Sequence, residues 1–519
     1  MPPPPSAASR DEPVIRDRGD ACPGALRLHA ADDGYLARVR IPGGLLTGRQ
    51  ASLLGLAADR FGDGHLELTS RGNVQLRGLA EGCGAGLAEL LDASGLLPAP
   101  GHERIRNIVA SPLSPTVVPW VRELDRLLCA NARVTALSGR FLFALDDGRG
   151  DVAALHPDVT VLGRAGGPDG GPAVARALVR LGAAAGAVEV AAPDAPRAAL
   201  LAAEYFLDAA EAAGTRAWRV RELPPEHALD EAEFAARLTA AGIAATPVPE
   251  VAWPYAAPPE PGATGAGRER ALCVLIPLGR LTSDQWRLLA QAAAGRDEDI
   301  LRVTPWRSVV LPGAAGLRPT AGPTAPEPAP GAGPGAPAGL TRPAGVELAE
   351  LSGLVVGADP GAGPAARPEP GTGPSGPVRP EPATEPSGPE SATEPSGPER
   401  SEAALLESAG LVVAGGSSWQ SVTACTGRPG CAKALADVRA DARAVAERAR
   451  GALPVHWSGC ERRCGHPRGT AWVDVLATRD GYQLSVHGRR PVPAGPDLAA
   501  ALRAARHTTT AASDADPTQ

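Results

Sequence analysis

Four cysteines toward the C-terminal end of the chain are grouped in two short segments. Cys425 and Cys431 enclose the residues TGRPG, and Cys460 and Cys464 enclose ERR. Thiolates are the usual ligands of iron–sulfur clusters, and the glycines and proline of the first segment allow a tight loop whose backbone N–H groups can face the cluster sulfides. The spacing therefore predicts one [4Fe-4S] cluster held by these four cysteines.

A structural Zn²⁺ site is the main alternative for the same thiolates. Cysteine pairs that bind zinc are usually about two to four residues apart. The gap of five residues between Cys425 and Cys431 disfavours such a site. The remaining cysteines are scattered and are predicted to be buried free thiols: Cys22, Cys83, Cys129 and Cys273.

The composition argues against several classes of partner. Lysine and arginine together number 51, against 58 aspartates and glutamates, so the formal net charge is −7 and no global basic field for nucleic acid is expected. The N-terminal segment lacks the apolar centre of a signal peptide, and no run of about 18 uncharged apolar residues occurs elsewhere. We therefore expect a cytoplasmic protein, without disulfides and without a nucleic-acid or membrane partner.

Nucleotide-binding motifs are also missing from the sequence. It contains neither a Gly-x-Gly-x-x-Gly fingerprint between a strand and a helix nor a Walker lysine. We therefore expect no bound NAD(P)H, and electrons should come from a separate reductase.

The elements that must position the cysteines include a repeated segment. Residues 41–78 align with residues 276–313 at an offset of 235 without a gap. Each copy reads as a strand, a helix with apolar residues at i, i+3 and i+4, and an alternating strand, which predicts a ferredoxin-like half-domain present twice. A fainter repeat places Ala110-Ser111 on Ala424-Cys425 near offset 314, and residues 138–140 on 458–460 near offset 320.

A segment dominated by Pro, Gly, Glu, Ser and Thr interrupts this pattern. Residues 314–400 include the tandem units ATEPSGPE at 383–390 and 392–399. Such a composition cannot bury enough apolar surface to offset its chain entropy, so the segment is predicted to be a disordered linker or insertion without a catalytic part. One island within it, residues 347–360, is similar to residues 404–419 and could be a partial duplication.

Several motifs carry a family resemblance. They are ACPGALRLHAADDGYLARVRIPGG at 21–44, LTSRGNVQLRG at 68–78, RNI at 106–108, GRFLFALDDG at 139–148, and the two cysteine loops. On these motifs the chain resembles the sirohaem-type nitrite and sulfite reductases, and within that superfamily the precorrin-3B synthase family. The second loop reads SGCERRCGHP, similar to the synthase form, whereas assimilatory reductases typically have Gly-Cys-Pro-Asn-Ser-Cys there.

The resemblance implies an O₂-dependent monooxygenase that hydroxylates C20 of precorrin-3A and closes a γ-lactone in aerobic cobalamin biosynthesis. It implies a mononuclear non-haem iron besides the cluster, for which His456 and His466 are the candidate ligands; they could instead orient loop carbonyls. The alternatives are a sirohaem-dependent nitrite or sulfite reductase and a non-catalytic Fe–S electron-transfer protein. In the reductase pattern the position of Leu142 carries a lysine, so its apolar side chain weakens the case for nitrite or sulfite chemistry.

The resemblance also implies a site for a tetrapyrrole polycarboxylate. Arginines are suited to bind carboxylates through two N–H groups. The predicted catalytic residues are Arg71, Arg106 and Arg140, and the predicted substrate-binding residues are Arg71, Asn73, Arg77, Arg106, Asn107 and Arg140. Solvated surface arginines, and asparagines that cap turns, are the alternative for this set.

The predicted fold class is α+β, with two ferredoxin-like half-domains and two nitrite/sulfite-reductase-type modules in a pseudo-two-fold arrangement. The predicted parts are residues 1–20 (disordered), 21–80 (half-domain 1), 81–265 (first module, without cluster cysteines), 266–313 (half-domain 2), 314–400 (disordered linker), 401–500 (cluster module) and 501–519 (disordered tail).

Overall fold

The computed structural model describes residues 22–165, 174–265, 270–296, 298–313, 398–467, 472–486 and 489–507. These residues all belong to one of the two units into which the chain divides. Mixed sheets with helices packed on them confirm the predicted α+β class. The predicted disordered N-terminus and the 347–360 island lie outside the described residues, and no helix within the described residues is long and apolar enough to cross a membrane.

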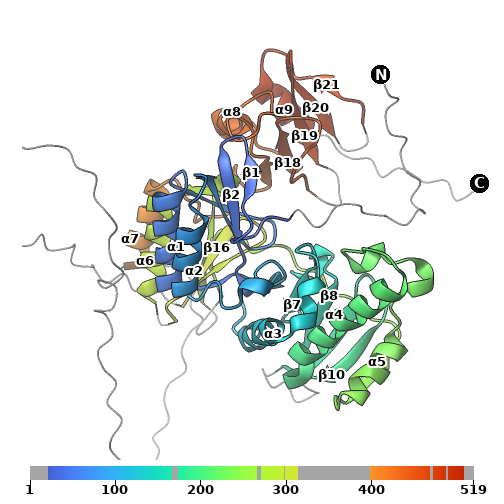
Figure 1. The fold of residues 1–519 in the computed structure, drawn as a ribbon. Helices are drawn as coiled ribbons and strands as arrows, with labels where there is room; N and C mark the ends of the chain where they lie inside the picture. The colour runs from blue at the N-terminus through green and yellow to red at the C-terminus, as the bar shows by residue number, and fades with distance from the viewer. Residues whose placement is uncertain are drawn as a thin grey trace, which may run out of the picture. The chain divides into compact units, whose positions relative to one another are not determined.

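Half-domain 1 pairs a short antiparallel sheet with two helices. Its elements are β1 (His29–Ala31), β2 (Gly34–Val39), β3 (Leu45–Thr47), α1 (Gly48–Phe61), β4 (His65–Leu68), β5 (Val74–Leu79) and α2 (Gly84–Ala93). Half-domain 2 has β12 (Gly262–Thr264), β13 (Ala271–Leu275), β14 (Arg280–Thr282), α6 (Ser283–Ala294), β15 (Ile300–Val303) and β16 (Ser308–Pro312). Their apolar faces share one core, and Figure 1 shows α1 and α6 side by side.

The two half-domains exchange a strand. The first sheet has the order β1-β2-β5-β4-β14, and the second has β12-β13-β16-β15-β3. Leu45 pairs with Arg302 in one sheet, and Arg280 pairs with Glu67 in the other. Both pairs obey the offset of 235, so a pseudo-two-fold axis in the structure relates the two copies of the sequence repeat.

The same local signals start both central helices. Thr47 and Gln50 form a capping box at the N-terminus of α1, and Thr282 and Gln285 form the equivalent box on α6. Each box satisfies backbone N–H groups that the first helical turn leaves without partners. At the contact between the helices, the buried Trp286 donates its indole N–H to the carbonyl of Ala51, 2.6 Å away.

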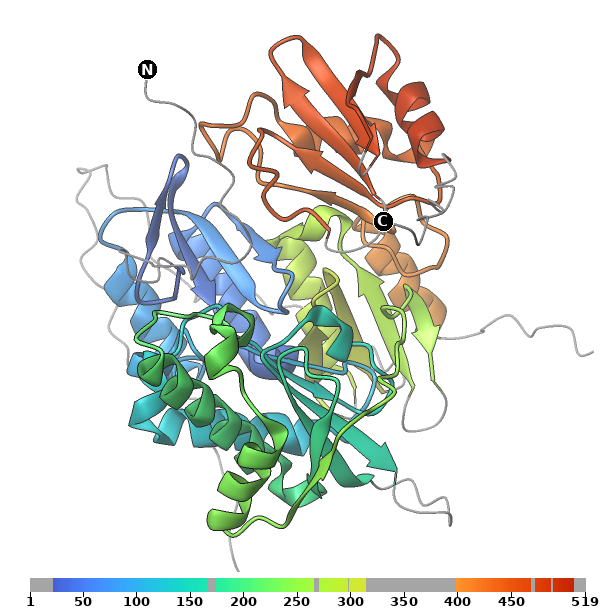
Figure 2. The same cartoon turned by 90° about the vertical axis from the view of Figure 1, so that its right-hand side faces the viewer.

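The first module carries a six-stranded sheet in the order β11-β10-β9-β8-β7-β6. Its elements are β6 (Ile108–Ala110), α3 (Val118–Ala130), β7 (Phe143–Asp146), β8 (Val159–Ala165), β9 (Val174–Leu181), β10 (Ala187–Ala191), α4 (Ala195–Ala212), α5 (Glu231–Ala240) and β11 (Ala245–Val248). The apolar faces of the helices bury the main core of the module against the sheet, and Figure 2 shows α4 and α5 packed together on it.

The C-terminal module has a five-stranded sheet in the order β17-β18-β19-β20-β21. Its elements are β17 (Val422–Ala424), α8 (Val438–Val445), β18 (Val455–Ser458), β19 (Val473–Thr478), β20 (Gly481–Val486), β21 (Val492–Pro493) and α9 (Leu498–Arg506), and α7 (Pro398–Ser408) precedes them. Helix α9 buries Leu502 and Arg506, so residues 501–506 belong to this module and not to a disordered tail.

The two modules share one topology. In the first module β6 pairs with β7 and β7 pairs with β8, both in parallel, and β9 then pairs with β8 in the antiparallel direction. In the C-terminal module β17 pairs with β18 and β18 pairs with β19, both in parallel, and β20 then pairs with β19 in the antiparallel direction. Ser111 N–H donates to the carbonyl of Leu145 at 3.0 Å, as Cys425 N–H donates to that of Trp457 at 2.9 Å, which supports offset 314. The offset of 320 is wrong. Phe143 pairs with β6 as Val455 pairs with β17, so these two residues are equivalent and the offset between them is 312.

Both ends of the linker meet one side chain. Arg296 donates to the carbonyl of Gly313, just before the linker, and to the carboxylate of Glu402, 2.8 Å away, just after it. The chain therefore leaves and re-enters the compact unit within a few residues of the same point, whatever lies between.

Replacing residues 320–396 with a Gly/Ser linker should therefore leave the fold intact. Shortening a loop from about 85 to about 25 residues changes the closure cost by roughly 1 kcal/mol, in the stabilising direction when its ends are close. We expect the iron content, and the turnover of the precorrin-3A that the family resemblance implies as substrate, to equal those of the full chain. A folded, iron-loaded but inactive variant would show that the 347–360 island contributes to the site.

Candidate iron–sulfur and substrate site

The first cysteine loop follows β17 directly. Cys425 Sγ accepts a hydrogen bond from the backbone N–H of Gly459 at 3.1 Å, so the two loops are already in contact through a thiol. Gly427 has φ +69°, and a Cβ at this position would lie 2.8 Å from Val438 Cγ2. Only glycine fits there, which explains why the TGRPG sequence has glycine at this position.

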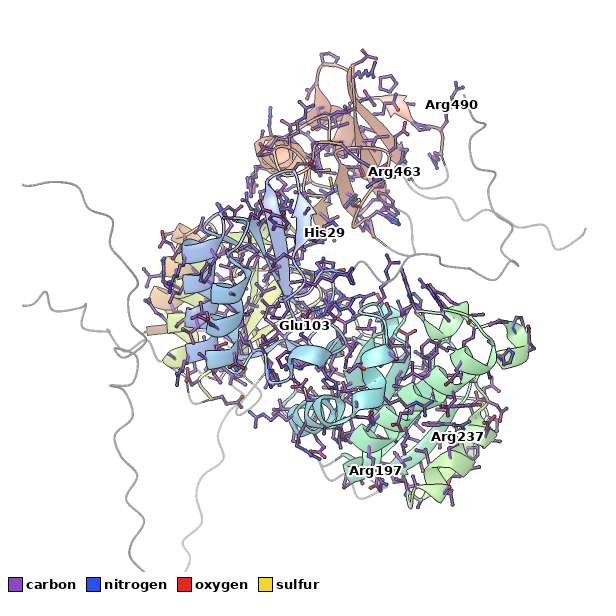
Figure 3. The ribbon with its side chains drawn as sticks, in the orientation of Figure 1. His29, Glu103, Arg197, Arg237, Arg463 and Arg490 are labelled. Atoms are coloured by element: carbon purple, nitrogen blue, oxygen red, sulfur yellow. The ribbon has the colours of Figure 1, made fainter. Side chains whose placement is uncertain are left out.

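The second cysteine loop follows β18 and is held by Asp474 of β19. The carboxylate of Asp474 accepts from the hydroxyl of Ser458 at 2.8 Å and from Arg463 Nε at 2.5 Å. Arg463 has a left-handed backbone conformation with φ +47°, and Figure 3 shows its side chain within the C-terminal module. The loop between Cys460 and Cys464 is thus anchored by a carboxylate that is itself 4% exposed.

The four thiols gather at the contact between these loops. Burial, followed by the charges of Cys425, Cys460 and Cys431, raises the pKa of the Cys464 thiol. Among the described residues, three metal-ligating side chains come within 4.8 Å of one another only at Asp146, Asp147 and Asp151, so no three of the four thiol sulfurs are that close together.

The sulfurs do not have the close spacing that a single tetrahedral ion needs. A tetrahedral Zn²⁺ with Zn–S bonds of about 2.3 Å would bring all four sulfurs within about 4 Å of one another. A cube of four irons has its thiolates at four corners and holds them further apart. The donor set of this structure therefore suits the predicted [4Fe-4S] group.

A pocket of about 680 Å³ adjoins the second cysteine loop. Its lining comes from both half-domains and both modules and includes Ser70, Arg71, Leu142, His156, Pro258, Pro259, Trp306, Arg307, Trp419, Thr423, Gly465 and His466. Much of this wall is apolar, while arginine and histidine supply cationic and titratable groups. Such a mixture is typical of a site that takes a large organic ligand with charged substituents.

Two equivalent hairpin turns face this pocket. The turn between β4 and β5 closes with a bond of 2.9 Å from Thr69 N–H to the carbonyl of Asn73, and the turn between β15 and β16 closes with one of 2.9 Å from Thr304 to Ser308. The pseudo-two-fold axis therefore brings the same turn to the pocket twice. The first contributes Arg71 to the lining.

The predicted site residues divide into two groups. Arg71 lines the pocket and donates from Nη1 to the carbonyl of Gly139 at 3.3 Å. Arg106 does not line it, because its Nε and Nη2 each donate to Asp125 at 2.7 Å and its Nη1 donates to Leu96 at 3.0 Å. This geometry favours an internal ion pair for Arg106.

Arg77 links half-domain 1 to the cluster loop. It binds Asp33 through two N–H groups at 2.9 and 2.8 Å, and Nη2 also donates to the carbonyl of Gly430 at 2.8 Å. Arg140 is exposed and lies over the ring of Trp218, 4.7 Å from its centroid. Neither side chain lines the pocket.

The two predicted asparagines are buried and bonded to one another. Asn73 Nδ2 donates to Asn107 Oδ1 at 3.1 Å, and Asn73 Oδ1 accepts from the backbone of Ile41 at 3.0 Å. Asn107 in turn donates to the carbonyl of Phe141 at 3.0 Å. These amides bind backbone segments beside the pocket. Such a structural role is closer to the turn-capping alternative than to substrate binding.

The candidate histidines lie together against Trp472. His466 stacks on its ring at 5.5 Å and lines the pocket, whereas His456 meets it edge-on at 6.0 Å. His456 Nδ1 is 2.8 Å from Thr423 Oγ1, and its Nε2 is buried without a partner among the described residues. Burial, and then the charges of Arg307 and His466, lowers the pKa of His456 to about 3, so the ring is neutral.

The four scattered cysteines were predicted to be buried, but among them only Cys273 is fully buried. Burial raises the pKa of its thiol to about 11. The other three, Cys22, Cys83 and Cys129, are half-buried.

Sequence reasoning missed Trp306 and Arg307, which also line the pocket. The signal was present, because the offset of 235 places them on Arg71 and Gly72 of the TSRGN motif.

Comparisons with known proteins agree with this architecture. The family model "Nitrite/Sulfite reductase ferredoxin-like half domain" matches residues 29–93 and 264–316. A precorrin-3B synthase of Sinorhizobium sp is 39% identical over 88 residues, which are 17% of this chain and 19% of that protein. A ferredoxin–nitrite reductase of Synechococcus elongatus is 30% identical over 141 residues, which are 25% of this chain and 27% of that protein. The aligned stretches thus span less than a third of these curated relatives.

The solved structure of Mycobacterium tuberculosis NirA protein shares the fold. It superposes with a TM-score of 0.56 at 17% sequence identity and covers 89% of this chain and 76% of that one. The chain therefore contains the ferredoxin-like half-domain of the nitrite/sulfite reductase family twice, within a NirA-like fold.

Proposed function

We propose that this chain is an oxidoreductase of the precorrin-3B synthase type, which holds a [4Fe-4S] cluster on Cys425, Cys431, Cys460 and Cys464 and hydroxylates precorrin-3A with O₂. The observation that carries the proposal is the meeting of the second cysteine loop with a pocket of about 680 Å³ that has apolar walls and arginine at its hairpins. The 39% identity to a precorrin-3B synthase supports this branch of the family.

The pocket residues suit a flat polycarboxylate. Trp306, Trp419 and the segment Pro258-Pro259 offer apolar surface to the faces and edges of a macrocycle. Arg71 can bind a peripheral carboxylate through a charge-assisted hydrogen bond. The neutral His456 and the stacked His466 could hold the mononuclear iron that the synthase resemblance implies.

The cluster would supply single electrons to this site when bound. The chain's own contribution is to fix the loops around it. The N–H of Gly459 bonds the sulfur of Cys425, and Asp474 fixes the second loop, so both act on the cluster's immediate surroundings.

A sirohaem-dependent nitrite or sulfite reductase is the second candidate. The matches to ferredoxin–nitrite reductases of Synechococcus elongatus and Leptolyngbya laminosa favour it, at 30% and 34% identity. Against it stands the apolar Leu142, which lines the pocket at the position where the reductase pattern has a lysine.

The test is an absorption spectrum and an assay on anaerobically purified protein. The synthase proposal requires a broad shoulder in the blue without a sirohaem band, and O₂-dependent conversion of precorrin-3A with a reductase as electron donor. A sirohaem band together with nitrite or sulfite turnover would establish the reductase instead. A cluster without either turnover would leave an electron-transfer protein.

Arg71→Ala should weaken the binding of precorrin-3A by about 2 kcal/mol, because the substrate carboxylate loses a charged donor at a partly desolvated site. Equilibrium binding followed by fluorescence quenching would measure the loss. Arg126→Ala is the matched control, since Arg126 is exposed on α3, pairs with Glu123 and does not line the pocket.

Arg106→Ala distinguishes the sequence prediction from the geometry. Loss of the buried pair with Asp125 should lower the free energy of unfolding by about 3 kcal/mol while the remaining folded protein binds substrate normally. Weakened binding with unchanged stability would restore Arg106 to the substrate site.

A further inference from the structure

Arg307 adopts a backbone conformation that arginine rarely takes. Its φ is +60°, and the equivalent residue of the first hairpin turn, at offset 235, is Gly72 with φ +65°. A left-handed conformation is unfavourable for a non-glycine residue, and such strain is concentrated at functional positions. The second copy of the turn therefore carries a side chain where the turn itself favours glycine.

The surroundings leave a channel for this side chain. A Cβ at Gly279 would lie 2.5 Å from Arg307 Cδ, so any larger residue there would displace it. At its far end, Nη2 lies 4.0 Å from the ideal Cβ position of Gly465, the residue after Cys464. The guanidinium thus reaches the pocket beside the second cysteine loop, and Arg307 is part of the lining.

The charge of Arg307 is not balanced by a carboxylate in contact with it. No hydrogen bond or ion pair joins its guanidinium to another residue in the described part of the chain. The nearby Glu67 is engaged elsewhere, by Arg439 at 2.5 Å and by Gln75 at 3.0 Å. Burial, and then the charge of Arg439, lowers the pKa of Arg307, whereas Glu67 raises it.

We propose that Arg307 binds a carboxylate of the ligand in this pocket, so that the two equivalent hairpins each supply one guanidinium, Arg71 from the first and Arg307 from the second. The proposal rests on the proposed function for the ligand class, a tetrapyrrole polycarboxylate. Arg307 is half-buried, and a partly desolvated cation without a protein counter-ion favours the binding of an anion. Two arginines from opposite halves of a pseudo-two-fold site would fix the orientation of a macrocycle whose carboxylates lie around its rim.

The test measures the binding of uroporphyrin III, a soluble porphyrin octacarboxylate, to the full chain with its cluster. Arg307→Gln keeps the first two methylene groups and removes the charge, and Arg307→Gly also relieves the backbone. We expect both variants to bind uroporphyrin about ten- to a hundredfold more weakly than the parent protein. The thermal unfolding midpoint of Arg307→Gly should not fall, because glycine suits φ +60°.

Asp299→Gly is the matched control. Asp299 is an exposed residue outside the pocket and also has positive φ, +43°, so the substitution relieves a comparable backbone without removing a pocket charge. It should leave uroporphyrin binding unchanged.

Three results would overturn the proposal: no uroporphyrin binding by the parent protein, equal binding by the parent and both Arg307 variants, or an effect confined to sulfite binding or to the cluster's reduction potential. Weaker uroporphyrin binding in the variants, without any precorrin-3A turnover by the parent, would retain Arg307 as a carboxylate ligand and reject the synthase activity.

Discussion

Cys460→Ala should remove essentially all cluster iron and acid-labile sulfide from the protein. A [4Fe-4S] cluster needs a thiolate at each iron, and the two cysteine loops have no other thiol to offer. Because the binding of metal to thiolates is coupled to folding, the C-terminal module should also become less stable. Iron and sulfide analysis after anaerobic purification measures the first effect, and limited proteolysis measures the second.

Cys83→Ala provides the comparison. Cys83 is half-buried at the start of α2, in half-domain 1, and should keep the parent content of iron and sulfide. An equal loss of iron in this variant would mean that the four grouped cysteines are not the ligand set.

Glu402→Ala should lower the free energy of unfolding by about 3 kcal/mol. The carboxylate of Glu402 and the guanidinium of Arg296 are each 2% exposed and meet at 2.8 Å. Removing one member of a buried pair leaves the other charge without compensation. Denaturant unfolding followed by tryptophan fluorescence would measure the change.

Glu407→Ala, on the exposed face of the same helix, should change the stability by less than about 0.5 kcal/mol. If both variants were equally stable, the contact between Arg296 and Glu402 would contribute nothing, and α7 would be held by Leu406 and its apolar neighbours alone.

The half-domain repeat could be predicted from the sequence because its signals are local. The helical periodicity, the capping residues Thr47 and Thr282, and the alternating strands all lie within short windows. The exchange of β3 and β14 could not be predicted in this way. Pairing between strands far apart in the chain depends on how whole elements pack, and both assignments bury the same apolar residues.

The candidate site shows the same division. The cysteine spacing selects four grouped thiols as the predicted ligands, whereas the arginines of the motifs could not be separated by sequence. Arg106 meets Asp125 from helix α3, and Arg77 meets Asp33 from the turn between β1 and β2. Only the folded chain shows that these cations already have partners and that Arg71 faces the pocket.

The second repeat was wrong in part for a related reason. The strands β7 and β18 are equivalent, but the segments that lead to them differ in length, so no single offset describes both modules. Matching short motifs such as Ser-Gly-Arg to Ser-Gly-Cys then shifts the alignment along the chain.

The strand exchange has a consequence for biosynthesis. While the N-terminal half emerges from the ribosome, β4 has a free edge, because its neighbour Arg280–Thr282 has not yet been made. Unpaired edges of this kind invite pairing with other chains. In the same half, β3 (Leu45–Thr47) also stays unpaired until β15 is synthesised, which happens later still. Neither half-domain can complete its sheet alone, so fragments that end between them should associate with themselves or with the complementary half.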